Sequence, residues 1–195
     1  MTVRSARRAE LLEFAYEYAM QHGRTDMSLR PMAAAIGSSP RVLLYLFGSK
    51  DGLIRALLAR ARADELRLLA ELRAGQHAGP DQRADGLAEA GEWIWSWLSN
   101  EARRPLLRLW LDGYARSLSQ PNGPWADFGR STVQDWLSLL AEFQPSSERS
   151  SAASLAERTL LLAVLRGALL DLLGTDDVAR TTAGVQRHLA VLQAS

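Results

Sequence analysis

SLRPMAAAIGSSPRVLLYLFGSKDGLI, residues 28–54, is the stretch that decides the fold of this chain. Its pattern predicts a short helix over about 28–36, a Gly-Ser turn, a second short helix over about 40–46 and the start of a third helix near residue 50. Gly37 suits the left-handed residue that ends a helix, and Ser39-Pro40 combines an N-cap with a first-turn proline. The stretch therefore predicts a helix-turn-helix.

The second helix of this motif has one apolar face. Leu43 and Phe47 lie four residues apart, so both side chains are expected to pack inward. The outer side, which a DNA major groove would meet, is then formed by Arg41, Val42, Leu44 and Tyr45.

The start of the third helix offers a site for a phosphate. Ser49 is expected to cap this helix, which would present Lys50 and backbone N–H groups to an anion. Lys50 is the only lysine in the sequence, beside 22 arginines. A bias of the whole sequence toward arginine is the simpler explanation for a single lysine. The position of Lys50 at the start of a helix nevertheless favours a phosphate contact.

The composition limits the classes of function. Hydrophobic residues make up 47% of the 195 residues, which is enough for a packed core. The absence of cysteine excludes disulfides, Cys-ligated zinc and a cysteine nucleophile. His22, His77 and His188 lie far apart in the sequence, so we predict no metal site and no cofactor. Neighbouring motifs supply neither a nucleophile with its base nor a Gly-rich phosphate loop, so we predict no catalytic residue and disfavour an enzyme.

Positive charge is concentrated near the N-terminal end. Residues 1–60 hold nine Lys and Arg against five Asp and Glu, a net of +4, whereas residues 61–195 carry a net of −3. This asymmetry suits a polyanion partner at one end. Glu10 and Glu13 precede any signal-like apolar run, and the apolar stretch 159–173 is cut by Arg166 and Asp171. We therefore expect a soluble cytoplasmic protein with no membrane contact.

Helical periodicity recurs along the chain between short Gly, Pro and Ser breaks, and strand signals are almost absent. The expected fold class is therefore all-α. Nine helices are predicted, at about 4–22, 28–36, 40–46, 50–74, 81–99, 102–119, 124–143, 148–173 and 177–193. Residues 75–82, with two glycines and a proline, could form a flexible joint between two helices.

Residues 8–60 resemble the N-terminal heads of TetR/AcrR transcriptional regulators, whose pattern is similar to T-v-x-x-I-A-x-x-A-G-V-S-x-x-x-L-Y-x-H-F-x-S-K-x-x-L. The matching positions are Ser28, Met32, Ala33, Gly37, Ser39, Leu43, Phe47, Ser49, Lys50 and Leu53. Beyond residue 60 only the number and length of the helices agree. The resemblance implies a nine-helix TetR-like fold, with a helix-turn-helix DNA-binding domain over residues 1–48 and a helical effector-binding and dimerisation domain over residues 49–195.

Carried over position by position, the resemblance implies phosphate contacts for Ser28, Tyr45 and Lys50 and base contacts for Arg41. Ser39 and Val42 complete the predicted DNA-binding set.

The chain departs from the family pattern at three positions. Ser38 replaces the usual valine, Leu44 stands where a tyrosine is typical, and Leu46 stands where a histidine or tyrosine is common. Tyr45, one place after Leu44, could supply the aromatic hydroxyl instead. The two leucines keep a second function open, that of a helix-turn-helix-like module that binds a protein partner instead of DNA.

All six tryptophans lie beyond residue 90. Plain packing of large rings explains any single one, but the resemblance implies an effector cavity among the fourth to eighth helices. Aromatic walls suit a small apolar or aromatic ligand. The predicted pocket residues are Trp97, Trp110, Tyr114, Phe128 and Trp136.

The predicted eighth helix is apolar all round between Leu155 and Leu173, so it must be covered on every side. A buried central helix in a monomer would satisfy this, but a two-fold homodimer that pairs the eighth and ninth helices of each chain is the simpler solution. The predicted interface residues are Leu161, Leu165, Ala168, Leu172, Val185 and Leu189. Two heads would then meet a near-palindromic operator. The whole pattern predicts a homodimeric repressor that a small effector releases from double-stranded DNA.

Overall fold

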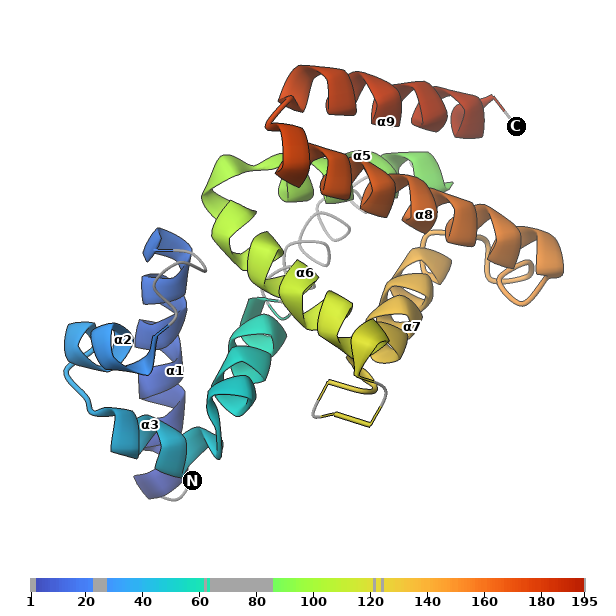
Figure 1. The fold of residues 1–195 in the computed structure, drawn as a ribbon. Helices are drawn as coiled ribbons and strands as arrows, with labels where there is room; N and C mark the ends of the chain where they lie inside the picture. Colours follow the sequence, from blue (N-terminus) through green and yellow to red (C-terminus); the bar gives the residue numbers. More distant parts are fainter. Residues whose placement is uncertain are drawn as a thin grey trace, which may run out of the picture. The chain divides into compact units, whose positions relative to one another are not determined.

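The computed structural model describes residues 3–22, 28–61, 63, 86–120, 122–123 and 125–194, and these residues form helices and turns without a strand. The helices labelled in Figure 1 are α1 (Val3–His22), α2 (Leu29–Ala35), α3 (Pro40–Phe47), α5 (Gly86–Ser99), α6 (Arg104–Ser119), α7 (Phe128–Ala141), α8 (Ala152–Thr175) and α9 (Val178–Gln193). A short 3-10 helix, η2 (Glu101–Arg103), precedes α6. A further helix covers residues 50–61. The predicted all-α class is confirmed, and each predicted helix has a counterpart among the described residues.

Two helices begin later than the sequence predicts. α7 begins at Phe128 instead of about residue 124, because turns precede it and the N–H of Ala126 donates to the carbonyl of Gly123. α8 begins at Ala152 instead of about residue 148, because Ser151 is its N-cap and accepts the N–H of Ser154 at 3.0 Å. Turn chemistry, which hydrophobic periodicity does not report, moves both boundaries.

Some expectations lie outside the described residues. These are the predicted joint at 75–82, the parts of predicted helices over 64–74 and 81–85, and the turn at 23–27.

The chain divides into two compact units. The first unit consists of Met1–Arg67 and Glu101–Ala126, and the second consists of Leu68–Asn100 and Asp127–Ser195. The first unit therefore contains the helix-turn-helix and also α6. The predicted functional boundary between residues 48 and 49 is a different division and stays a prediction.

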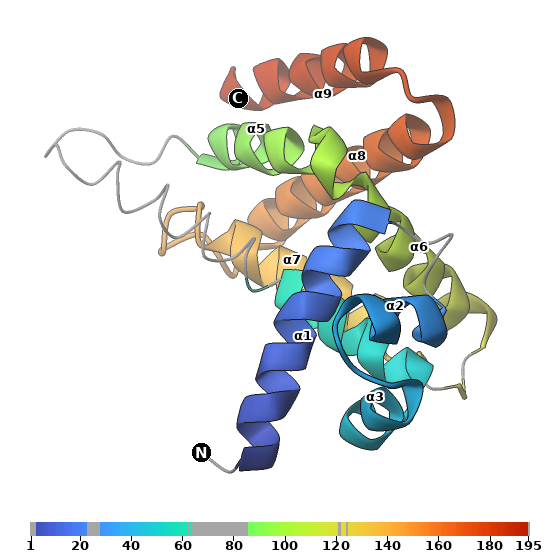
Figure 2. The same cartoon turned by 90° about the vertical axis from the view of Figure 1, so that its left-hand side faces the viewer.

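In the first unit, α2 and α3 pack against α1, and α1 also packs on α6 (Figure 2). The core of this unit comes from α1, α2, α3, the helix over 50–61 and α6. Its buried side chains include Leu11 and Ala15 of α1, Met32 and Ala33 of α2, Leu43 and Phe47 of α3, Leu53 and Leu57 of the following helix, and Leu106, Leu107 and Leu109 of α6. Phe14 is half-exposed, at the edge of the apolar arc of α1.

In the second unit, α5, α8 and α9 pack on one another, and α7 packs on α8. The indole N–H of Trp95 on α5 donates to the hydroxyl of Thr182 on α9 at 2.9 Å. The buried amide of Gln144 holds the connection from α7 to α8, because it donates to the carbonyl of Ser154 at 3.0 Å and accepts from Arg158 at 2.8 Å. The side chains of Trp95 and Gln144 are thus hydrogen-bonded to other helices of this unit.

An ion pair closes the turn between α8 and α9. The Arg180 guanidinium donates two hydrogen bonds to the Asp171 carboxylate, at 2.6 and 2.9 Å, and Asp177 caps α9 by accepting the N–H of Arg180 at 3.0 Å. Asp176 lies between them in the left-handed conformation, with φ of 62°. The hydrogen bonds from Arg180, and after them its charge, hold the pKa of the Asp171 carboxyl below its ordinary value.

We predict that Asp171→Asn lowers the melting temperature at pH 7 and that the loss disappears in acid. A carboxyl group whose pKa is lower in the folded protein than in the unfolded chain stabilises the fold at pH values above its ordinary pKa. This stabilisation is lost as the pH falls through the folded-state pKa. Thermal unfolding of both proteins between pH 7 and pH of about 3 measures the difference. Asp135→Asn, at an exposed aspartate of α7 away from this turn, is the matched control. A gap between wild type and Asp171→Asn that stays constant down to low pH would contradict the assignment.

Candidate nucleic-acid interface

The turn between α2 and α3 sets the angle of the motif. Ala33 is fully buried, and the two short helices are in contact. Gly37 has φ of 63°, a conformation that a residue with a side chain rarely adopts. The N–H of Ser38 donates to the carbonyl of Ala33 at 2.8 Å, so the end of α2 is satisfied as the chain reverses. The predicted role of Gly37 is confirmed.

Both ends of α3 are capped. The hydroxyl of Ser39 accepts the N–H of Val42 at 3.3 Å, and Pro40 occupies the first position of the helix. At the other end, the N–H of Gly48 donates to the carbonyl of Leu44 at 2.8 Å. The predicted Ser39-Pro40 start is therefore confirmed, and α3 is a closed segment of eight residues.

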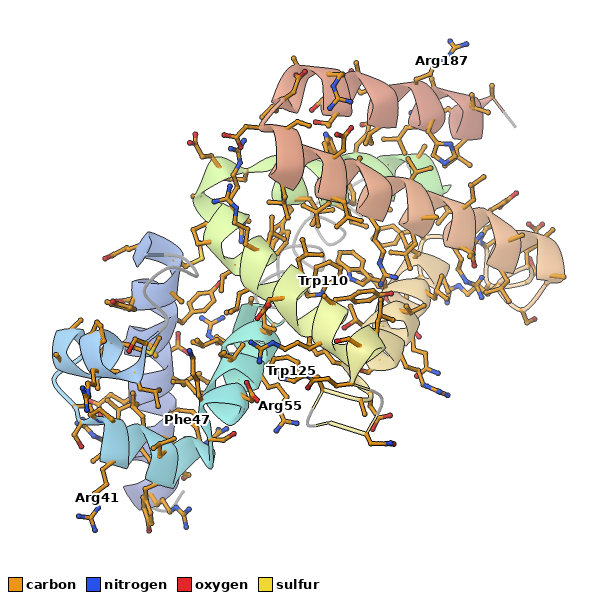
Figure 3. All side chains as sticks on the ribbon, in the orientation of Figure 1. Arg41, Phe47, Arg55, Trp110, Trp125 and Arg187 are labelled. Atoms are coloured by element: carbon orange, nitrogen blue, oxygen red, sulfur yellow. The ribbon has the colours of Figure 1, made fainter. Side chains whose placement is uncertain are left out.

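The two sides of α3 differ as the sequence predicts. Leu43 and Phe47 are 1% and 8% exposed. Arg41, Val42, Leu44 and Tyr45 are exposed, and the Arg41 side chain extends away from the ribbon in Figure 3. Tyr45 is 66% exposed, more than Val42 or Leu44. The outer side of α3 thus combines a cation, an aromatic hydroxyl and two apolar side chains.

The next helix begins immediately behind α3. The hydroxyl of Ser49 accepts the N–H of Gly52 at 2.9 Å, which confirms the predicted cap, and Lys50 is exposed in the first turn. A Cβ atom on Gly52 would collide with the carbonyl oxygen of Phe47. Glycine is therefore required at this position for the sharp step from α3 into the next helix, a requirement that the sequence did not reveal.

Ser28 precedes α2 with the extended backbone of an N-cap, but its side chain accepts no capping hydrogen bond. It is exposed, as a phosphate contact requires.

Two features of the motif's surroundings escaped the sequence interpretation. Arg116 of α6 pairs with Asp51 at 3.2 Å and with Asp112 at 3.1 Å, so α6 is tied to the residue that follows Lys50. The guanidinium groups of Arg4 and Arg8 on α1 lie over the rings of Tyr45 and Phe47. The basic cluster in residues 4–8 was the available signal, but only the packing of α1 on α3 brings it to these rings.

The predicted pocket residues fall in both units. Trp110 and Tyr114 belong to the first unit, where they stack on α6 with ring centroids 5.1 Å apart. Trp97, Phe128 and Trp136 belong to the second unit, and among these Trp136 is buried. A common cavity for the five side chains stays a prediction.

The predicted dimer residues lie mostly in the core of a single chain. Five of them, Leu161, Leu165, Leu172, Val185 and Leu189, are at most 2% exposed, and Ala168 is partly exposed. They are buried because α5 packs on α8 and α9. The dimer interface itself stays a prediction.

Comparisons with known proteins agree with this geometry. No family model matches the chain. A TetR-like transcriptional regulator from Rhodococcus sp. RHA1 superimposes with a TM-score of 0.53 and 21% identity, over 99% of this chain and 96% of that one. The fold is therefore that of the TetR-like regulators, and the resemblance expected from the sequence is confirmed for the fold.

A curated relative, the HTH-type transcriptional regulator BetI of Stenotrophomonas maltophilia (strain R551-3), is 25% identical over 119 residues. The match covers 61% of this chain and spans 58% of the length of that relative.

Two further observations concern the described residues alone. None of their helices has the length and apolar character needed to cross a bilayer. No group of three or more of their His, Asp or Glu side chains could hold a metal ion.

Proposed function

We propose that this chain is a transcriptional regulator that inserts α3 into the major groove of double-stranded DNA. The observation that carries the proposal is the orientation of α3, with Leu43 and Phe47 buried and Arg41 and Tyr45 exposed one turn apart on its outer side. The TetR-like fold and the similarity to two transcriptional regulators support it. The chain acts as a binding protein in the cytoplasm, without catalysis.

The exposed residues divide into two kinds of contact. Arg41 reads base edges, because a guanidinium can donate two hydrogen bonds to the O6 and N7 atoms of guanine. Ser28, Tyr45 and Lys50 contact phosphates, which fixes the register of α3 on the duplex. Ser39 and Val42 lie at the start of α3 and border the groove.

We predict that Arg41→Ala and Lys50→Ala weaken DNA binding in different ways. Arg41→Ala removes a base contact and costs about 1–3 kcal/mol on the selected sequence, with little loss on random DNA. Lys50→Ala removes a phosphate contact, so it weakens both complexes and lowers the slope of log K against log salt by about 0.9. Fluorescence anisotropy with a duplex selected from a random pool, and with a random duplex, measures both effects.

Arg130→Ala, at an exposed arginine of α7, is the control for the loss of one positive charge. Equal losses for Arg41→Ala and Lys50→Ala on both duplexes would contradict the division of roles.

The exposed side of α8 supports a homodimer. Its residues at successive spacings of four and three are all apolar or small and all exposed: Ala156, Leu160, Ala163, Gly167, Leu170 and Gly174. We call these six residues the α8 seam. Leu160 and Leu170 are 54% and 49% exposed, so both leave apolar surface open on this side. A period of 3.5 residues is the pattern by which one helix packs along another, and a second copy of α8 supplies the same pattern.

We predict that the protein is a dimer and that Leu160→Glu weakens the dimer at least tenfold, because a two-fold axis buries two unpaired carboxylates. Leu155→Glu is the matched control, since Leu155 is 45% exposed on the same helix but lies outside the α8 seam. Sedimentation equilibrium of the three proteins measures the dissociation constants. A monomeric wild type, or equal weakening by both substitutions, would contradict the proposal.

An effector is proposed to act through α6. Arg116 of α6 holds Asp51, the residue next to Lys50, so a shift of α6 would move the phosphate-binding turn. The stacked rings of Trp110 and Tyr114 lie on the same helix, where a flat apolar ligand would contact them. The ligand needs only a different affinity for the DNA-bound and free conformations to act as an inducer.

We predict that a screen of planar aromatic compounds finds at least one that raises the melting temperature and releases the selected duplex. Trp110→Leu should weaken the binding of this compound at least tenfold. Trp93→Leu is the control, because Trp93 packs edge-on against Phe143 and lies outside the predicted pocket set. Binding that responds equally to both substitutions would place the ligand elsewhere.

A protein-binding module is the second candidate function. Val42 and Leu44 are 38% and 40% exposed on the outer side of α3, where two apolar side chains would also suit a protein partner. A wild-type protein that binds neither duplex at low salt would favour this candidate over the first.

A further inference from the structure

Two arginines of α1 lie against the rings of α3. The guanidinium carbon of Arg4 is 4.7 Å from the centroid of the Tyr45 ring, and that of Arg8 is 4.9 Å from the centroid of the Phe47 ring. Arg4 and Arg8 are four residues apart, so they occupy the same face of α1. Figure 1 shows the N-terminal half of α1 beside α3, and the two helices are in contact. The two cations therefore lie along one edge of the outward-facing helix.

Arg7 of the same helix provides a contrast. Its guanidinium pairs with Glu10 at 2.7 Å, within α1. Arg4 and Arg8 lie over aromatic rings instead, and the two interactions leave different groups available. An ion pair takes up N–H groups of a guanidinium, whereas a cation–π contact is made by its charge and requires no N–H hydrogen bond.

A contact with an aromatic ring also restricts the rotamers of an arginine side chain. A free arginine loses rotamer freedom when it binds a phosphate, but a guanidinium already held on a ring loses less. Tyr45 is exposed and lies one turn from Arg41 on the outer side of α3, so Arg4 is held beside the side proposed to face DNA.

We infer that Arg4 and Arg8 form a second phosphate-binding edge, which grips the phosphodiester backbone beside the groove that α3 enters. This inference rests on the proposed function. Lys50 holds the backbone at the end of α3 that leads into the next helix, and the α1 edge adds contacts next to Tyr45 and Phe47. The edge recognises charge and spacing, not base sequence, so it strengthens specific and random complexes alike.

The test is the salt dependence of binding to a random-sequence duplex and to a duplex selected from a random pool by the wild-type protein. Each lost phosphate contact lowers the slope of log K against log salt by about 0.9, and it weakens binding by about five- to tenfold near 0.1 M salt. Arg4→Gln and Arg8→Gln should each show this loss on both duplexes. Arg7→Gln, the matched control on the same helix, should leave the slope unchanged.

Arg4→Lys separates charge from ring packing. It keeps a cation at the same place, so it should retain most of the wild-type slope, while a purely structural role for Arg4 predicts the same defect for Lys and Gln. Circular dichroism melts of each variant check folding. Arg4→Gln is the deciding variant. The Tyr45 ring that Arg4 covers is exposed, so removing the guanidinium leaves no cavity in the core.

The outcomes distinguish this inference from the proposed function. If the wild type binds both duplexes but Arg4→Gln keeps the full slope, or Arg7→Gln loses as much, the α1 edge is overturned and the regulator stands. If Arg4→Lys is as weak as Arg4→Gln, the contact is not electrostatic and the inference is overturned. If the wild type binds no duplex at any salt, both proposals fail together.

Discussion

The inward packing of Leu43 and Phe47 is the interaction on which the candidate DNA interface depends. A helix of eight residues has little stability of its own, so its packing decides its orientation. Burying each of these side chains contributes about 1.5–3 kcal/mol, which fixes the rotation of α3 about its axis. With that rotation set, Arg41 and Tyr45 face outward.

Two positively charged side chains, Lys50 and Arg4, lie close to α3. Lys50 follows the capped turn at Ser49, and Arg4 lies over Tyr45 on the other side. Other cations of the first unit are paired with carboxylates: Arg60 with Glu13 at 2.7 Å and Arg116 with Asp51. The same pairing joins α6 to the start of the helix over 50–61. A single small region therefore combines the surface proposed to read DNA with the contact proposed to transmit a signal to it.

The sequence predicted the motif well because its determinants are local. The turn needs Gly37, and the helix caps need Ser39 and Ser49. The inner face of α3 needs two large apolar residues four positions apart. Each of these can be recognised in the amino-acid sequence. Contacts between distant segments were not predictable in this way. The stacking of Arg4 on Tyr45 and the pairing of Arg116 with Asp51 depend on how helices cross. For the same reason, the dimer prediction named the apolar residues of α8 that α5 and α9 cover, although the exposed α8 seam has a clear period of its own.

A structure of the protein bound to a selected duplex tests the central claim most directly. The account predicts α3 in the major groove, with the Arg41 guanidinium within hydrogen-bond distance of a base edge and the Lys50 ammonium at a phosphate. A complex in which α3 stays in solvent, or in which the duplex lies against another surface of the chain, would contradict it.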